Sequence, residues 1–246
     1  MKKIFLLLSL TLLSCSVFSQ GNPTRIKISD DIELIKLSDN AYIHVSYSVV
    51  TGYGRTGANG LIFINDGDAF LFDTPWNDTQ TETLVTYLKE KMHLQVKGFI
   101  PNHWHEDCMG GLAYLIKAGI PTYANQKTID IARQKHLPVA EHGFSDSLML
   151  MSGNREIHCY FLGAAHSTDN VVVWIPSENI LFPGCMVKSM NATNLGNTAD
   201  GNLAEYPKTI QSVIKKFRGA KIVIPGHGDF GGPELLSHTL SLTQKQ

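Results

Sequence analysis

Short apolar runs and stretches with helical spacing alternate along the chain, and together they predict the order of its elements. In the first half, residues 31–48 are typical of strands, and residues 60–72 predict a hairpin that turns at Asn65-Asp66-Gly67. Residues 79–82, Thr-Gln-Thr-Glu, match a capping box and open a predicted helix that continues to about residue 92. The other elements expected in this half are a buried strand and two helices, over residues 94–100, 110–118 and 126–135.

The same order repeats in the second half. Its predicted strands cover residues 156–163, 170–175, 179–183 and 221–225. Its predicted helices begin near Pro207 and Pro233, since proline is favoured in the first turn of a helix. Strands followed by helices, twice over, predict an α/β protein of two similar halves whose sheets pack face to face beneath outer helices, a four-layer αββα sandwich. No linker rich in Pro, Gly or Ser separates the halves, so residues 20–246 are expected to form one domain.

The N-terminus has the pattern of a secretory signal peptide. Two lysines precede residues 4–13, an apolar run that is too short to cross a bilayer. Small or β-branched residues before Gln20 fit a cleavage site, so residues 1–19 are expected to be removed. Cys15 lies in an imperfect lipobox, and a lipid anchor on this residue is the alternative. No later apolar stretch is long enough to span a membrane, so we expect a periplasmic protein that is soluble or tethered.

Composition and charge exclude several classes of function. The 246 residues are 43% hydrophobic and 17% charged, which suits a globular protein with one sizeable core. The formal net charge of -1 and the lack of a basic run give no reason to expect nucleic acid or an acidic membrane as a partner. Cys15 would be removed or lipidated, which leaves Cys108, Cys159 and Cys185, and an odd number of cysteines argues against a disulfide framework.

Potential metal ligands follow four of the predicted strands. Residues 103–107, His-Trp-His-Glu-Asp, come directly after the strand that ends near Ile100. His166, Cys185 and His227 each follow another strand, beside small residues that allow close approach of the backbone. Neutral imidazole, thiolate and carboxylate are all good ligands of zinc. The sequence therefore predicts a metal site where these loops meet along one edge of the sheets, with room for two neighbouring ions.

With these motifs, the chain resembles the metallo-β-lactamase superfamily, and within it the subclass B1 enzymes. The resemblance covers essentially everything after residue 19. Besides the histidines and Cys185, it rests on Lys188, on residues 195–197 (Leu-Gly-Asn) and on Asp73, which matches the family's structural aspartate beside the metal loop. It implies the metallo-β-lactamase fold, zinc-dependent hydrolysis of the amide bond in the β-lactam ring, and hence antibiotic resistance.

The resemblance also implies how the ligands are divided between two zinc ions. The set expected for the first ion is His103, His105 and His166, and the set expected for the second is Asp107, Cys185 and His227. Three neutral imidazoles leave one tetrahedral position for water, whose pKa zinc lowers to about 7. A metal-bound hydroxide is then the expected nucleophile, and no covalent acyl-enzyme is needed. Asp107 is therefore expected to serve catalysis as well as metal binding.

Further residues are expected to contact the substrate, a small β-lactam that can be a penicillin, a cephalosporin or a carbapenem. Lys188 and Asn197 complete the expected catalytic set. Lys188 is expected to pair with the carboxylate next to the ring nitrogen, and Asn197 to donate a hydrogen bond to the carbonyl oxygen or to that carboxylate. Residues 51–57 match the family's mobile flap, in which Tyr53 is placed to contact apolar substituents. Trp76 is expected in the wall of the site, and the chain is expected to act as a monomer.

Two positions in the first loop need separate interpretation. Many family members have arginine at position 108, and Cys108 is expected to change the polarity behind the second zinc. Glu106 is acidic, but it is not assigned as a ligand, because alternation along the motif points it away from His105 and Asp107.

Two other functions remain open at this point. A thioesterase of the glyoxalase II type shares the His-x-His-x-Asp pattern, but it has a histidine directly after the aspartate and an aspartate that bridges its metals. Those positions are Cys108 and Cys185 in this chain. The other alternative is a zinc-binding protein without activity, and the complete ligand set together with Lys188 argues against it.

Overall fold

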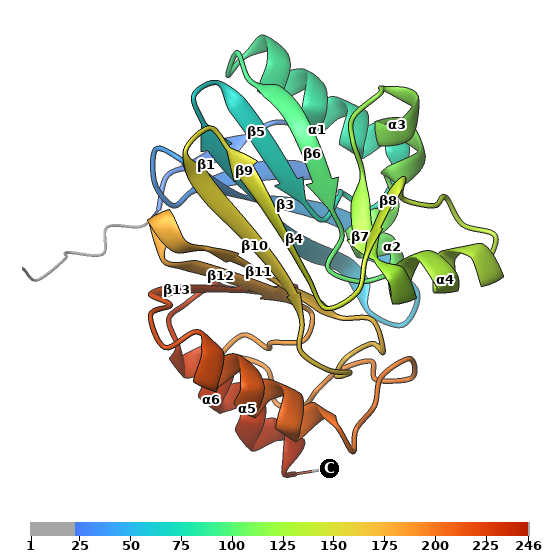
Figure 1. Ribbon diagram of the computed structural model, residues 1–246, viewed down its shortest axis with the longest axis vertical. Coiled ribbons are helices and arrows are strands. Elements are labelled where there is room, and N and C mark those ends of the chain that lie inside the picture. Colours follow the sequence, from blue (N-terminus) through green and yellow to red (C-terminus); the bar gives the residue numbers. More distant parts are fainter. Residues whose placement is uncertain (1–22, 246) are drawn as a thin grey trace, which may run out of the picture.

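Two β-sheets packed face to face form the centre of the molecule, and helices cover both outer faces (Figure 1). The computed structural model describes residues 23–245, so the predicted signal peptide and Cys15 lie outside it. The arrangement confirms the predicted four-layer αββα sandwich. No helix between residues 23 and 245 is both long and apolar enough to cross a membrane.

The larger sheet contains, in spatial order, β1 (Arg25–Lys27), β2 (Ile32–Lys36), β3 (Ala41–Val50), β4 (Gly54–Asn65), β5 (Asp68–Phe72) and β6 (Gln95–Ile100). The second sheet contains β13 (Ile222–Pro225), β12 (Ile180–Gly184), β11 (Val171–Ile175), β10 (Arg155–Phe161) and β9 (Ser147–Ser152). A small third sheet pairs β7 (Tyr123–Asn125) with β8 (His142–Phe144). The helices are α1 (Asp78–Glu90), α2 (Glu106–Met109), α3 (Leu112–Lys117), α4 (Gln126–Gln134), α5 (Tyr206–Lys216) and α6 (Glu234–Thr243), with a 3-10 turn η1 (Pro176–Glu178).

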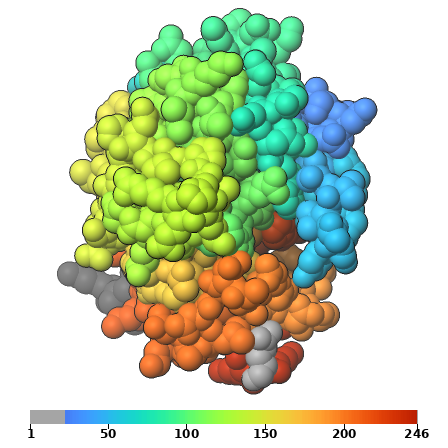
Figure 2. Space-filling view, turned by 90° about the vertical axis from the view of Figure 1, so that its right-hand side faces the viewer, coloured from blue at the N-terminus to red at the C-terminus, as the bar shows by residue number. Residues whose placement is uncertain are grey.

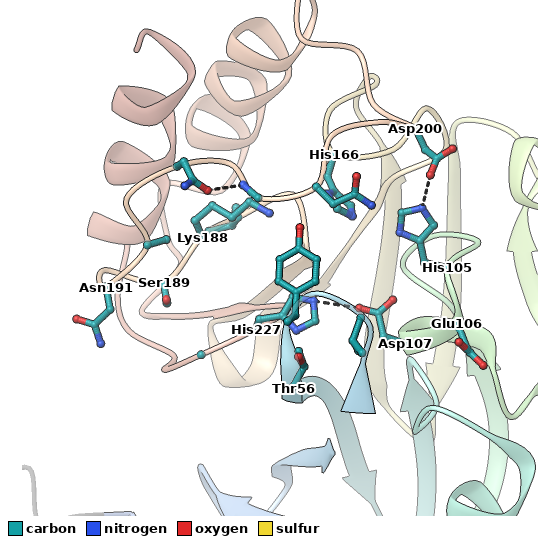
Figure 3. A pocket seen from close by; sticks show the side chains of 18 of the residues that line it. Thr56, His105, Glu106, Asp107, His166, Lys188, Ser189, Asn191, Asp200 and His227 are labelled. Carbon is teal, nitrogen blue, oxygen red and sulfur yellow. Dashed lines mark hydrogen bonds and ion pairs between the residues drawn. The ribbon is translucent and has the colours of Figure 1, made fainter. Parts of the chain in front are cut away.

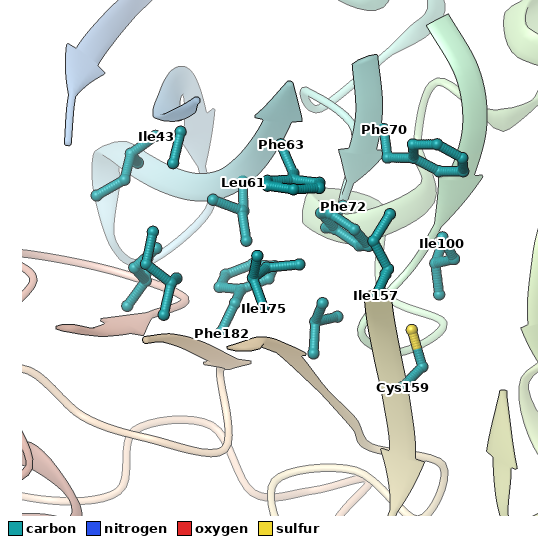
Figure 4. Close-up of a cluster of buried hydrophobic side chains, with 14 of the residues drawn as sticks. Ile43, Leu61, Phe63, Phe70, Phe72, Ile100, Ile157, Cys159, Ile175 and Phe182 are labelled. Carbon is teal, nitrogen blue, oxygen red and sulfur yellow. The ribbon is translucent and has the colours of Figure 1, made fainter. Parts of the chain in front are cut away.

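The central strands are buried on both faces, which explains their continuous apolar runs. In β4, Leu61 packs into the core between the sheets, whereas Ile62 belongs to the cluster beneath α1 and α3. In β11, Val171 likewise faces the core between the sheets, whereas Val172 packs beneath α5 and α6. Figure 4 shows the shared core, in which aromatic and aliphatic side chains of both sheets interdigitate.

Several local predictions differ from the structure. The capping box was wrong, because α1 begins at Asp78 and its cap is Asn77, whose Oδ1 accepts a hydrogen bond from the Gln80 amide at 2.9 Å. The helix expected over 110–118 is the short α3, and the one-turn helix α2 directly before it was not predicted. The sequence analysis also missed four strands, β1, β7, β8 and β9. Three of these have 3 residues each, too few for a clear pattern. β9 is an edge strand whose Leu and Met residues give an apolar run without β-branched or aromatic residues, so its strand signal is weak.

The topology brings the loops that carry the predicted ligands to one edge of the sandwich. β12 and β13 pair in parallel, so the loops that follow them leave at the same end of the second sheet. β6, which pairs in parallel with β5, ends at the His-x-His motif in the first sheet. Gly226 allows these loops to approach closely, because a Cβ at this position would overlap the Cys185 side chain.

A buried histidine beneath this edge depends on a glycine opposite it. His44 of β3 is paired with Gly60 of β4, and its Nε2 is 3.0 Å from the carbonyl oxygen of Asp73. Burial lowers the pKa of His44 to about 4, so the ring is neutral near pH 7. A Cβ at Gly60 would overlap the imidazole and lie 2.7 Å from the carbonyl oxygen of Phe72.

We therefore expect Gly60→Ala to destabilise the fold by about 2–3 kcal/mol, since neither the buried ring nor the backbone can move freely. Urea unfolding followed by circular dichroism measures this. Gly219→Ala is the matched control, because a Cβ there has no neighbour within 4 Å, and it should change stability by less than about 0.5 kcal/mol. Equal midpoints for the two variants would contradict the packing role of Gly60.

Candidate metal centre

The three predicted ligands of the first ion lie together. The ring centre of His103 is 4.4 Å from that of His105 and 4.9 Å from that of His166, and His105 and His166 are 5.2 Å apart. Burial, followed by the neighbouring His105, lowers the pKa of His103 to about 3. Burial also lowers the pKa of His166 well below its usual value. Both rings are therefore neutral near pH 7 and keep a lone pair for a metal ion.

One orphaned atom supports metal binding at this cluster. Nδ1 of His166 is buried and has no hydrogen-bond partner among the residues that the structure describes. A buried polar atom without a partner is costly, and a metal ion is one of the groups that can satisfy an imidazole nitrogen. The donor set of this cluster therefore fits zinc.

The predicted ligands of the second ion form an adjacent cluster, in which the ligand atoms of Asp107, Cys185 and His227 all lie within 4.8 Å of one another. Nε2 of His227 is 3.0 Å from Oδ2 of Asp107, and Sγ of Cys185 is 3.6 Å from the same oxygen. Burial opposes ionisation of Asp107, but the hydrogen bond from His227 and the nearby imidazoles hold its pKa below the usual range.

This second cluster favours a positive charge among its donors. A hydrogen bond with Cys108 lowers the pKa of the Cys185 thiol to about 6, against the effect of burial. Burial disfavours the charged form of His227, yet Cys185 and Asp107 raise the pKa of this ring well above its usual value. A thiolate, a carboxylate and an imidazole that together attract positive charge are a fitting donor set for a divalent ion such as zinc.

A cavity of about 790 Å³ opens over both clusters. Figure 2 shows the hollow between the blue hairpin of the first sheet, the green segment after β6 and the orange loop that precedes α5. In Figure 3, His105, Asp107, His166 and His227 converge on it from three sides, with Lys188 beside them. The four predicted substrate-contacting residues all line the cavity; they are Tyr53, Trp76, Lys188 and Asn197.

The surroundings of these four residues differ. Nζ of Lys188 donates a hydrogen bond to the carbonyl oxygen of Cys185 at 2.8 Å, and burial lowers the pKa of this lysine, with Cys185 and Asp107 opposing the shift. Asn197 is exposed, and its Oδ1 accepts from the Ala199 amide at 3.1 Å, so its amide nitrogen is the atom directed to donate.

The two aromatic residues hold opposite positions in the wall. Tyr53 is 68% exposed at the tip of the β3–β4 hairpin, where it lines the cavity. Trp76 is buried, and its Nε1 donates to the carbonyl oxygen of Ser46 at 3.0 Å, so it is a fixed part of the wall.

Asp200 is a functional candidate that the sequence analysis missed. Its Oδ2 accepts a hydrogen bond from Nε2 of His105 at 3.0 Å, which leaves Nδ1 of His105 facing His103 (Figure 3). Such a contact fixes the tautomer and orientation of a ligand imidazole. Asp200 lies in an irregular loop far from the His-x-His motif in sequence, so no spacing rule connects the two.

Two interpretations of the first loop change. Glu106 is exposed, lines the cavity and belongs to neither cluster, but the alternation argument was wrong, because the helix α2 begins at this residue. Cys108 was expected behind the second zinc, but it also contacts the first cluster. Its Sγ is 3.2 Å from Nδ1 of His103, which belongs to the first.

Comparison with known proteins agrees with this geometry. The family model described as "Metallo-beta-lactamase superfamily" matches residues 53–227. The chain belongs to this superfamily. A metallo-beta-lactamase type 2 of Bacteroides fragilis is 49% identical over 245 residues, which cover 100% of this chain and 97% of that protein. Another of the same name, from Pseudomonas aeruginosa, is 34% identical over 239 residues, covering 97% of this chain and 92% of its own.

Solved structures agree as well. A metallo-beta-lactamase from Pontibacter korlensis superposes with a TM-score of 0.84 at 38% identity, covering 87% of this chain and 100% of its own. One from Hirschia baltica superposes with a TM-score of 0.81 at 33% identity, covering 87% of this chain and 98% of its own.

The cluster around Cys185 predicts how metal binding responds to a change of ligand. We expect Cys185→Ser to lose about one equivalent of metal at a fixed free concentration, because a serine hydroxyl stays protonated where the thiol ionises. Metal analysis after equilibrium dialysis measures the loss. Cys159→Ser is the control, since Cys159 is buried in the core between the sheets and should leave the metal content unchanged. Unchanged metal content in Cys185→Ser would show that Cys185 is not a ligand.

Proposed function

We propose that this protein is a zinc-dependent β-lactamase, which hydrolyses the amide bond of the β-lactam ring with two bound zinc ions and without a covalent acyl-enzyme. The observation that carries the proposal is the meeting of the three-histidine cluster, the Asp107–Cys185–His227 cluster and Lys188 at one cavity. Relatives that are 49% and 34% identical over nearly their whole length are named metallo-beta-lactamase type 2.

The residues of the two clusters would divide the work unequally. His103, His105 and His166 would hold one ion as neutral donors, whereas Asp107 and Cys185 bring negative charge to the other. When bound, zinc lowers the pKa of water to about 7 and acts as a Lewis acid toward the amide carbonyl. Ser189 lines the cavity, but within residues 23–245 no hydrogen bond joins its hydroxyl to a base that would activate it as the nucleophile of an acyl-enzyme.

The remaining polar residues would orient the substrate. An ammonium group has three donors, and Lys188 uses one of them on the carbonyl oxygen of Cys185. Two donors are left for the carboxylate that lies next to the ring nitrogen in β-lactams. The Asn197 amide nitrogen would donate to the same carboxylate or to the ring carbonyl, where negative charge develops during attack.

We further propose that the substrates include penicillins, cephalosporins and carbapenems. These classes share the ring amide and the neighbouring carboxylate, which are the two features that the clusters and Lys188 would recognise. A cavity of about 790 Å³ is in the range that accommodates drug-sized ligands.

The decisive experiment is hydrolysis of a chromogenic cephalosporin by the mature protein, before and after removal of metal with a chelator. We expect activity that is lost on chelation and restored by zinc, with metal analysis approaching two equivalents per chain. Activity that survives complete metal removal would refute the proposal. A protein that cleaves thioesters and not the cephalosporin would instead be a thioesterase of the same fold.

Lys188→Ala should mainly weaken substrate capture. A partly desolvated lysine–carboxylate pair contributes on the order of 1.5–3 kcal/mol, so kcat/KM should fall roughly 10- to 150-fold. The loss should shrink for an analogue without the ring carboxylate, and zinc content should stay near that of the wild type. Lys208→Ala is the control, because this lysine is exposed on α5 away from the cavity. Equal losses on both substrates would show that Lys188 does not contact the carboxylate.

The N-terminal pattern supports export. We propose that residues 1–19 are removed, so that the mature protein begins at Gln20. We also propose that it is a monomer in the periplasm, where it would meet β-lactams before they reach their targets. Mass spectrometry of periplasmic material tests the mature end. A lipid-modified Cys15 in the membrane fraction would establish the anchored form instead.

A further inference from the structure

Cys108 lies between the metal centre and the rigid core, and neither proposed ligand set includes it. It is buried in α2, with its Sγ 3.2 Å from Nδ1 of His103. Its thiol also lies within hydrogen-bonding reach of the Asp73 carboxyl group and the Cys185 sulfur. Asp73 is fixed in turn, because its carboxyl group accepts from the Asn102 amide and its carbonyl oxygen meets Nε2 of His44. A continuous chain of contacts therefore runs from the first sheet through Cys108 to His103.

The two nitrogens of His103 face different surroundings. Nε2 is on the side of the ligand cluster, 2.8 Å from Nδ1 of His105, whereas Nδ1 faces Cys108. A ligand imidazole gives one nitrogen to the metal and carries its proton on the other, and the partner of that N–H sets the tautomer. The group opposite Nδ1 must therefore accept a hydrogen bond if Nε2 is to bind metal.

A thiol meets this requirement, because it is both a weak acceptor and a weak donor. It can accept from Nδ1–H of His103 while its own proton is shared between the two acceptors beside it, the Asp73 carboxyl group and the Cys185 sulfur. An arginine at this position could not take this role, because a guanidinium group is a donor only and would place N–H against N–H. Cysteine at this position is thus compatible with a direct contact to His103 that arginine could not make.

We propose that Cys108 is a positioning residue for His103: its sulfur accepts the Nδ1 proton, and Nε2 of His103 is thereby held as the metal-binding atom. The inference rests on the metal binding in the proposed function. Cys108 itself touches neither substrate nor metal in this arrangement. Its effect is on how tightly the first cluster binds zinc and on the tautomer of one ring.

The test compares Cys108→Ala, which removes the acceptor, with Cys108→Ser, whose hydroxyl also accepts and donates. Competition with a chromophoric chelator measures zinc affinity. Cys108→Ala should weaken zinc binding at the first cluster about 10- to 100-fold, the range for loss of a partner that orients a ligand. Cys108→Ser should restore most of the affinity. Cys159→Ala is the matched control, a buried cysteine of the core that should leave zinc affinity unchanged.

A second measurement reports the tautomer directly. Long-range proton–nitrogen correlation spectra of the zinc-loaded wild type should show His103 protonated at Nδ1 and bound through Nε2. In Cys108→Ala, the exchange of the Nδ1 proton with water should become faster, a change that a purely structural role would not produce. The measurement on the wild type stands even if the alanine variant fails to fold.

The outcomes separate this inference from the proposed function. A wild type that binds no zinc would refute the proposed function. Normal zinc binding by the wild type with unchanged affinity in Cys108→Ala, or a His103 bound through Nδ1, would overturn only the role of Cys108. A thiolate-to-metal absorption band in cobalt-loaded Cys185→Ser would also overturn it, because it would show that Cys108 is itself a ligand.

Discussion

The burial of both sheets on both of their faces is the constraint on which the rest of the structure depends. Consecutive residues such as Leu61 and Ile62 enter two different apolar clusters, so the middle of a central strand has no face left for chemistry. A polar side chain there is desolvated and needs a buried partner, as His44 of β3 has in the carbonyl oxygen of Asp73. The reactive groups are therefore confined to the strand ends, and His103, His166 and His227 all lie on loops that leave the same edge.

The cost of burying polar groups at this edge is offset by a connected set of partners. His105 donates to Asp200, His227 has the Gly57 carbonyl oxygen 2.8 Å from its Nδ1, and Lys188 donates to a backbone carbonyl. Each contact satisfies one atom, and the other nitrogens of His105 and His227 are left facing the ligand clusters. The same contacts also fix the orientation of these side chains. The hydrogen bonds that satisfy the buried polar groups therefore also hold the metal-binding atoms in place.

The parts that sequence predicts are those with a local physical cause. The hairpin turn follows from Asp66 and Gly67, which both adopt positive φ, and the ligand loops follow from apolar runs that end at histidine or cysteine. The α1 cap was misplaced because Asn77 and Thr79 both suit a cap, and only packing decides between them. Asp200 could not be predicted, because its pairing with His105 depends on how a long irregular loop folds over the site.

The two sides of the cavity are built differently, and this bears on what can vary. The ligands are fixed from behind by the core, through contacts such as that of Cys108 with His103. Tyr53 and Asn197 are exposed on a hairpin tip and an irregular loop, where a substitution disturbs little else. Changes on the exposed side can therefore alter which substrate is bound without altering the hydrolytic centre. A change beneath the ligands acts on the reaction with every substrate, because it moves the metal-binding atoms themselves.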